Sequence, residues 1–284
     1  MNSLEQITKR LPNPDSVSAG TTATFRIPVG RRIHQLLLEY AHSANLNVSH
    51  FEEIRIFING SVFQRFSGTT RDKINQFDGR AAANGVLVIP FDRTGLKTVA
   101  GEEETAINTG VSDENGRKIS QMYMEIDIAA GATISASDLK LSAIESDAVA
   151  GGAGMIPYIR TEQRTAAGAT NDFQIADLVN PGLNAPDKVA LSRVHFTPSA
   201  GSIGHLEVNR NTYTLFERSD ALNRAIQADG MRHPVAGMYT IDTAERGHGS
   251  RVISLYGMTD YRYRLDVSES MTIECTSEYF GVLQ

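Results

Sequence analysis

The stretch Met122-Tyr123-Met124-Glu125-Ile126-Asp127-Ile128 alternates apolar and polar side chains, which is the period of a β-strand with one buried face. A second stretch, Tyr261-Arg262-Tyr263-Arg264-Leu265-Asp266-Val267, has the same pattern near the end of the chain. The apolar positions of each stretch are expected to point into a core. These positions are Met122, Met124, Ile126 and Ile128 in the first stretch, and Tyr261, Tyr263, Leu265 and Val267 in the second.

Short strand patterns of this kind dominate the rest of the chain. Residues 54–58 and 86–89 are rich in β-branched and aromatic side chains, and pairs such as Asn59-Gly60 and Asn84-Gly85 supply turns between strands. Helical patterns are confined to two short stretches, 70–77 and 220–228, the second with Asp220 as its expected cap. Many short strands with polar turns predict an all-β protein built as a sandwich or barrel, with short helices in loops.

The order of these features in the first half of the chain recurs in the second half. A shared order of this length predicts the duplication of a whole sandwich, and its period is far too long for a solenoid repeat. The matched positions are Phe25 and Phe173, Leu38 and Val194, Ile54 and Leu206, Phe66 and Phe216, Asp78-Gly79 and Asp229-Gly230, Gly85 and Gly237, and Ile126 and Leu265.

Small residues between the two copies indicate a linker. Residues 148–154 are alanine, valine and glycine, which bury too little apolar area to form an element of their own. We therefore expect four parts along the chain. They are an N-terminal arm at 1–20, a first sandwich at 21–150, a linker at 151–156 and a second sandwich at 157–284.

Charge and cysteine content narrow the range of functions. The net charge of −6, with basic residues spread along the sequence, argues against direct binding of nucleic acid. The single cysteine, Cys275, excludes an intrachain disulfide and is expected to be a buried core thiol. No apolar signal-peptide core and no run long enough to span a membrane are present, which favours synthesis in a reducing host cytoplasm.

Motifs for catalysis and cofactor binding are missing. The seven histidines lack both the spacing of metal ligands and a neighbouring nucleophile, and the His-x-His pair of a metal-binding cupin does not occur. We therefore expect no enzyme activity and no cofactor. A structural calcium ion at the acidic turn Asp113-Glu114-Asn115-Gly116 remains an alternative, while Glu102-Glu103-Glu104 is expected to be a solvated loop.

Several segments are similar to one known family. Ser18-Ala19-Gly20-Thr21-Thr22-Ala23-Thr24-Phe25-Arg26-Ile27, Gly85-Val86-Leu87-Val88-Ile89-Pro90-Phe91 and Arg193-Val194-His195-Phe196 resemble the corticovirus-type major capsid proteins of tailless, icosahedral, membrane-containing bacteriophages. The resemblance spans about residues 17–282. It implies a double jelly roll, with each sandwich a jelly roll. It also implies a homotrimer that presents six sandwiches as a pseudo-hexamer above an internal membrane. The implied partners are neighbouring trimers, a vertex (penton) protein and viral membrane proteins or lipid.

The N-terminal residues form a pattern of their own. Leu4, Ile7 and Leu11 fall on one helical face, with Lys9 and Arg10 beside them, and prolines follow. The pattern predicts a short amphipathic helix at the inner surface of the capsid. This arm is expected to pack on a neighbouring subunit, with contact to anionic lipid as the alternative.

These observations predict a structural major capsid protein of a virion. Two alternatives remain: a carbohydrate- or receptor-binding β protein of a phage, and an enzyme built on a duplicated sandwich. The first alternative calls for an exposed aromatic platform, and the chain contains no tryptophan.

Overall fold

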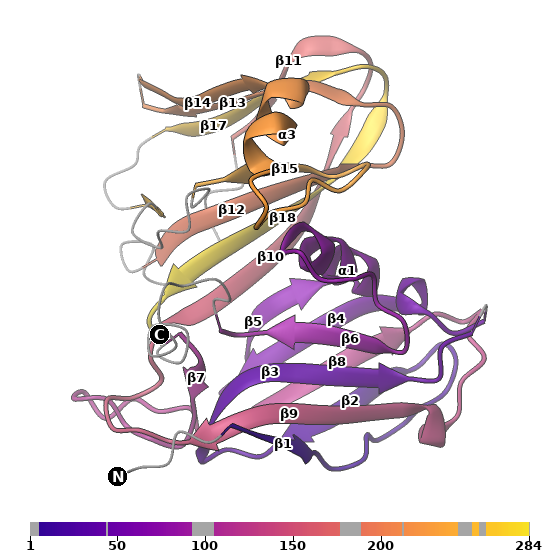
Figure 1. Ribbon diagram of the computed structural model, residues 1–284, viewed down its shortest axis with the longest axis vertical. Helices are drawn as coiled ribbons and strands as arrows, with labels where there is room; N and C mark the ends of the chain where they lie inside the picture. The colour runs from indigo at the N-terminus through magenta and orange to yellow at the C-terminus, as the bar shows by residue number, and fades with distance from the viewer. Residues whose placement is uncertain are drawn as a thin grey trace. The chain divides into compact units, whose positions relative to one another are not determined.

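The computed structural model describes residues 6–43, 45–92, 105–176, 189–211, 213–243, 252–255 and 260–283. The chain divides into two compact units (Figure 1). The first unit comprises residues 1–75, 81–158 and 281–283, and the second comprises 76–80, 159–280 and 284. Each unit therefore contains a short segment, 281–283 in the first and 76–80 in the second, that is separated in sequence from the rest of that unit.

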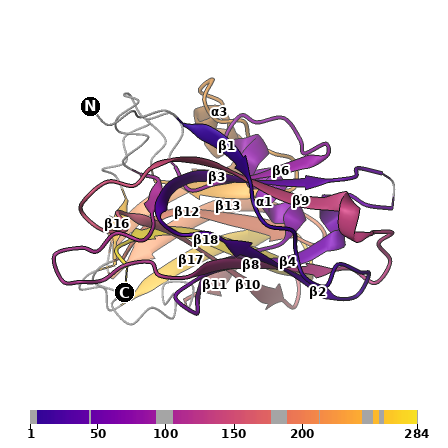
Figure 2. The same cartoon turned by 90° about the horizontal axis from the view of Figure 1, so that it is seen from below.

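Two sheets of antiparallel strands make up the first unit. Figure 2 separates them, with β3 and β6 on one side and β8 and β2 on the other. One sheet has the order β1 (Ile7–Arg10), β9 (Leu139–Asp147), β3 (Arg31–Tyr40), β6 (Val86–Pro90), with β7 (Ile107–Asn108) also pairing with β3. The other has the order β5 (Ser61–Phe66), β4 (Phe51–Ile58), β8 (Met122–Ile128), β2 (Thr22–Ile27).

The second unit repeats this arrangement strand for strand. Its β10, β18, β12 and β15 follow the order of β1, β9, β3 and β6, while β14, β13, β17 and β11 follow that of β5, β4, β8 and β2. The bounds are β10 (Ile156–Ala166), β18 (Met271–Gly281), β12 (Val189–Pro198), β15 (Tyr239–Asp242), β14 (Tyr213–Ser219), β13 (Ile203–Arg210), β17 (Tyr261–Val267) and β11 (Thr170–Ile175), and β16 (Ile253–Ser254) pairs with β12 as β7 pairs with β3.

Alternation along β8 and β17 fills the two cores as predicted. Met124 and Ile126 on β8, and Tyr263 and Leu265 on β17, are completely buried. Cys275 on β18 is buried as well, and burial raises the pKa of its thiol to about 12. The prediction of a core thiol is therefore confirmed.

In each repeat an α-helix follows a β-hairpin, which is β4–β5 in the first repeat and β13–β14 in the second. Helix α1 (Gly68–Phe77) and helix α3 (Asp220–Gln227) lie where the sequence predicts them, and two 3-10 turns, η1 (Val48–His50) and η2 (Ala136–Asp138), add further short helices. Asp220 was the expected cap of α3, but the hydroxyl of Ser219 accepts the amide of Leu222 instead. Asp220 is thereby the first helical residue, where its carboxylate lies 2.8 Å from the Arg224 guanidinium.

Hydrogen-bond register shows how closely the two repeats correspond. Pairing in β4 with β5 shifts between Ile56 and Phe57, and pairing in β13 with β14 shifts between Val208 and Asn209. The offset in residue number from Ile56 to Val208 also links two side-chain hydrogen bonds of the helices. Asn75 donates to the Val88 carbonyl, and its counterpart Gln227 donates to the Thr240 carbonyl, both at 2.8 Å. A bulge and a side-chain bond retained at matched positions support the predicted duplication.

Residues 7–10 form a strand, so the prediction of an amphipathic helix through these residues is wrong. β1 pairs antiparallel with β9, from Ile7 opposite Glu145 to Arg10 opposite Ser142, and Leu11 donates its amide to the Leu141 carbonyl at 2.9 Å. A helix this short is unstable alone, whereas the edge of β9 offers unpaired backbone groups. Backbone pairing with β9 therefore determines the conformation of these residues, and their helical periodicity does not.

Among the described residues, no helix is long and apolar enough to cross a membrane.

Candidate functional site

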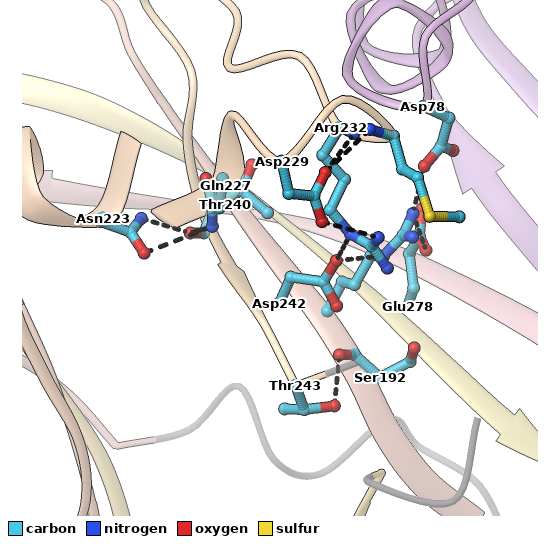
Figure 3. Close-up of polar contacts among 12 residues, drawn as sticks. Asp78, Ser192, Asn223, Gln227, Asp229, Arg232, Thr240, Asp242, Thr243 and Glu278 are labelled. Carbon is cyan, nitrogen blue, oxygen red and sulfur yellow. Dashed lines mark hydrogen bonds and ion pairs between the residues drawn. The ribbon is translucent and has the colours of Figure 1, made fainter. Parts of the chain in front are cut away.

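A dense set of charged side chains lies inside the second unit (Figure 3). We call it the ionic cluster. It comprises Asp78, Arg193, Asp229, Arg232, Asp242 and Glu278.

Two arginines hold the ionic cluster together. Arg193, on β12, lies 2.7 Å from the Asp78 carboxylate, 3.3 Å from Asp242 and 3.8 Å from Glu278. Arg232 lies 2.6 Å from the same Asp242 carboxylate, whose side chain is completely buried. Asp78 belongs to the segment 76–80, so the cluster binds this segment within the second unit.

Electrostatics in the cluster favour the charged forms. Burial opposes a charge on Arg193, but the carboxylates of Asp78, Asp242 and Glu278 outweigh it and raise the pKa of the guanidinium. A buried carboxylate between two guanidinium groups is stable only while both partners are present. The arginines and carboxylates of the cluster therefore stabilise one another inside the second unit.

Beside the cluster, a second set of polar groups fixes α3 to β15. The amides of Asn223 and Gln227 both donate to the Thr240 carbonyl at 2.8 Å, and the Thr243 hydroxyl donates to the Ser192 carbonyl at 2.8 Å (Figure 3). Asn223 and Gln227 are buried. Helix α3 therefore turns a polar face toward its own sheet.

His34, His50 and His195 each have a hydrogen-bond partner within the fold. Burial, helped by the nearby Arg32 charge, lowers the pKa of His34 to about 4, and its Nε2 lies 2.8 Å from the Ser146 hydroxyl. His195 is buried with its Nδ1 2.9 Å from the Thr240 hydroxyl. His50 accepts the Asn47 amide in a capping box. His248 lies outside the described residues.

The acidic turn at Asp113 is closed by local bonds. One Asp113 carboxylate oxygen accepts the amides of Asn115 and Arg117, and the other accepts the Arg117 guanidinium at 2.8 Å. Within the described ranges, no group of three potential ligands is placed to hold a metal ion. The calcium alternative stays a prediction, and residues 102–104 lie outside the described residues.

The predicted N-terminal site residues are brought together only in part. Ile7, Lys9 and Arg10 are exposed on β1, whereas Leu11 is buried, and Leu4 lies outside the described residues. Lys9 lies 3.9 Å from the Glu145 carboxylate. A strand points alternate residues to opposite sides, so the single apolar face expected of a helix does not form.

Two sandwiches with one strand order, and polar groups engaged in structural bonds, define the class of a structural double jelly-roll protein. The family models named "Viral coat protein P2 N-terminal domain" and "Viral coat protein P2 C-terminal domain" match residues 8–148 and 156–283. The chain belongs to the viral coat protein P2 family. It is therefore a viral coat protein with a structural, non-enzymatic role, and it assembles with other capsid subunits in the virion shell.

Solved structures share the fold at low sequence identity. The major capsid protein P2 of bacteriophage PM2 matches with a TM-score of 0.82 and 18% identity, covering 99% of this chain and 98% of that chain. A chain from the structure of Sulfolobus Turreted Icosahedral Virus matches with a TM-score of 0.69 and 12% identity, covering 98% and 91%. The Faustovirus major capsid protein matches with a TM-score of 0.62 and 7% identity, covering 100% and 91%. No curated protein sequence matches the chain.

The ionic cluster was not predicted from the sequence. Its members come from segments far apart in the chain, and each alone has the appearance of an ordinary surface charge. A usable signal was the presence of Arg193 within a predicted strand and of Asp242 directly after an apolar run, because charges at such positions need buried partners.

Proposed function

We propose that three copies of the chain form a pseudo-hexameric trimer, and that such trimers tile an icosahedral shell over an internal membrane. The duplicated strand order supports this proposal, because three chains then supply six similar sandwiches to a site of hexagonal symmetry. Neighbouring trimers, a vertex (penton) protein and viral membrane proteins or lipid are the proposed partners. Synthesis in the host cytoplasm and absence of direct contact with nucleic acid belong to the same proposal.

The N-terminal segment is proposed to lie at the inner surface of the shell. Exposure of Ile7 and of the basic residues Lys9 and Arg10 supports a contact surface on this strand. Protease protection of residues 7–10 in assembled shells, but not in free subunits, checks this placement. Equal cleavage in both states would argue against it.

Mass measurement tests the trimer most directly. Light scattering on the purified chain is expected to give three times the monomer mass of 30.9 kDa at micromolar concentration. Negative-stain images are expected to show six-lobed particles. Monomer alone across the concentration range would contradict the proposal.

A further inference from the structure

Helix α3 presents apolar side chains to solvent. Leu222 and Ile226 are 51% and 39% exposed, and Leu215 on the neighbouring β14 is 46% exposed. We call these three residues the α3 face. The helix instead buries the polar residues Asn223 and Gln227, which is the reverse of an ordinary surface helix. An apolar patch of this kind marks an interaction surface.

The first repeat shows what happens to the same positions when a partner is present. The offset in residue number from Ile54 to Leu206 matches the residues of the α3 face to positions in the first repeat. Their counterparts are Phe63 for Leu215, Thr70 for Leu222 and Ile74 for Ile226. These residues are 2%, 3% and 0% exposed. Positions that are covered in one repeat are therefore open in the other.

The cover over β5 is the beginning of strand β10. The Phe63 ring packs against Tyr158 at 6.4 Å between centroids, and the neighbouring Gln64 donates to the Pro157 carbonyl at 2.8 Å. Residues 156–158 belong to the first unit, although the rest of β10 belongs to the second. Within the first unit, the edge of β5 is thus closed by residues 156–158.

Strand β1 is the counterpart of β10, since each pairs with the corresponding strand of its own repeat, β9 or β18. All four residues of β1 are exposed. Among the described residues, β14 pairs with β13 alone, so its outer edge is open.

We propose that β1 of a second copy of this chain covers the α3 face and the open edge of β14. This inference rests on the proposed trimer. In a ring of repeats, the second repeat of one chain is followed by the first repeat of the next, so the contact within one chain is repeated between chains. A head-to-tail contact of this kind closes into a ring when the rotation permits.

A charge-introducing variant tests the surface in the full chain. Leu222→Asp combined with Ile226→Asp is expected to raise the trimer dissociation constant at least about a hundredfold, because two apolar contacts are lost and two carboxylates are desolvated. The matched control is Val29→Asp, at a residue 38% exposed and outside the α3 face. It is expected to stay trimeric. Sedimentation velocity across a dilution series measures both.

Each outcome separates this inference from the proposed trimer. If the wild type is trimeric and the double variant associates equally well, the α3 face is not the contact surface. The proposal of a trimer is then unaffected. A monomeric wild type overturns both. A double variant that remains trimeric but loses binding to anionic lipid vesicles assigns the surface to a membrane and also overturns the proposal.

Cross-linking keeps the inference falsifiable if the double variant fails to fold. A chain with Lys9→Cys and Leu215→Cys is expected to form covalent dimers and trimers with a short thiol-to-thiol linker, because the proposal places the exposed strand β1 of one copy against Leu215 of another. A chain with Val29→Cys and Leu215→Cys is the control. Buried Cys275, with its pKa raised to about 12, contributes no background. Equal yields from the two variants overturn the proposal.

Discussion

The outer faces of β3 and β12 occupy matched places in two sandwiches of the same topology. On β12, Arg193 lies opposite Asp242 across the sheet, and both belong to the ionic cluster. On β3, Gln35 lies opposite Pro90 in the corresponding register. Backbone pairing is therefore kept while the side chains differ. The two repeats therefore share the backbone pairing of the sheet. The side chains on its outer face differ according to the segment that each sheet contacts.

The second repeat holds a specific segment, which explains its charges. Asp78 binds Arg193, and the Phe77 ring packs edge-on against His195 at 5.9 Å. Arg193 on β12 thus binds the carboxylate of this segment. The matched residue on β3, Gln35, makes long hydrogen bonds to Asp92, at 3.3 and 3.4 Å. We expect mutations in the shared cores to have similar effects, and mutations on the outer faces to have unequal ones.

The largest effect is expected in the cores, where the repeats are alike. Ile126→Asp and its counterpart Leu265→Asp each place an unpaired carboxylate at a completely buried position. Each is expected to cost about 4 kcal/mol or more in the free energy of unfolding. Denaturant titration and soluble yield measure the loss. Normal yield and stability from either variant would show that its strand does not face a core.

A smaller and unequal effect is expected on the outer faces. Asp242→Asn leaves Arg193 and Arg232 short of a buried counter-charge and is expected to cost about 3 kcal/mol. Gln35→Met at the matched place on β3 is expected to change stability by about 0.5 kcal/mol. Equal losses from the two variants would remove the distinction between the sheets.

A third effect, smaller than those of the core and cluster substitutions, concerns pH and belongs to the first repeat. Because burial lowers the pKa of His34 to about 4, the unfolded chain takes up a proton below its usual pKa of 6.5 while the folded chain does not. Stability from this group is therefore present at neutral pH and lost as pH falls. The loss is about 2 kcal/mol between pH 7 and pH 5. In His34→Gln, denaturant titrations at both pH values are expected to show a loss smaller by that amount. An unchanged pH dependence would contradict a neutral buried His34.

Periodicity and turn chemistry predicted much of the fold. Alternation in 122–128 and 261–267 placed β8 and β17 at their observed bounds, and the ordered repeat anticipated the matched strand order. Helices α1 and α3 were also predicted, because the spacing of their apolar residues is a local signal. These features depend on neighbours in sequence, which a single chain displays directly.

Two features depended on tertiary structure. Residues 7–10 have a helical pattern but became a strand, since the free edge of β9 supplied backbone partners. Leu222 and Ile226 lie outward because Asn223 and Gln227 bond to β15. These outcomes were decided by groups distant in the chain, which local periodicity does not register.

The sequence by itself determined the all-β class, the duplication, the buried strand faces and the structural role, because each follows from residue pattern and family likeness. Only the tertiary structure decided where segment 76–80 belongs and which charges pair with it. Segment 76–80 and Arg193 meet through long-range contacts, and the energy of a buried charge depends on partners that the linear order of residues does not specify.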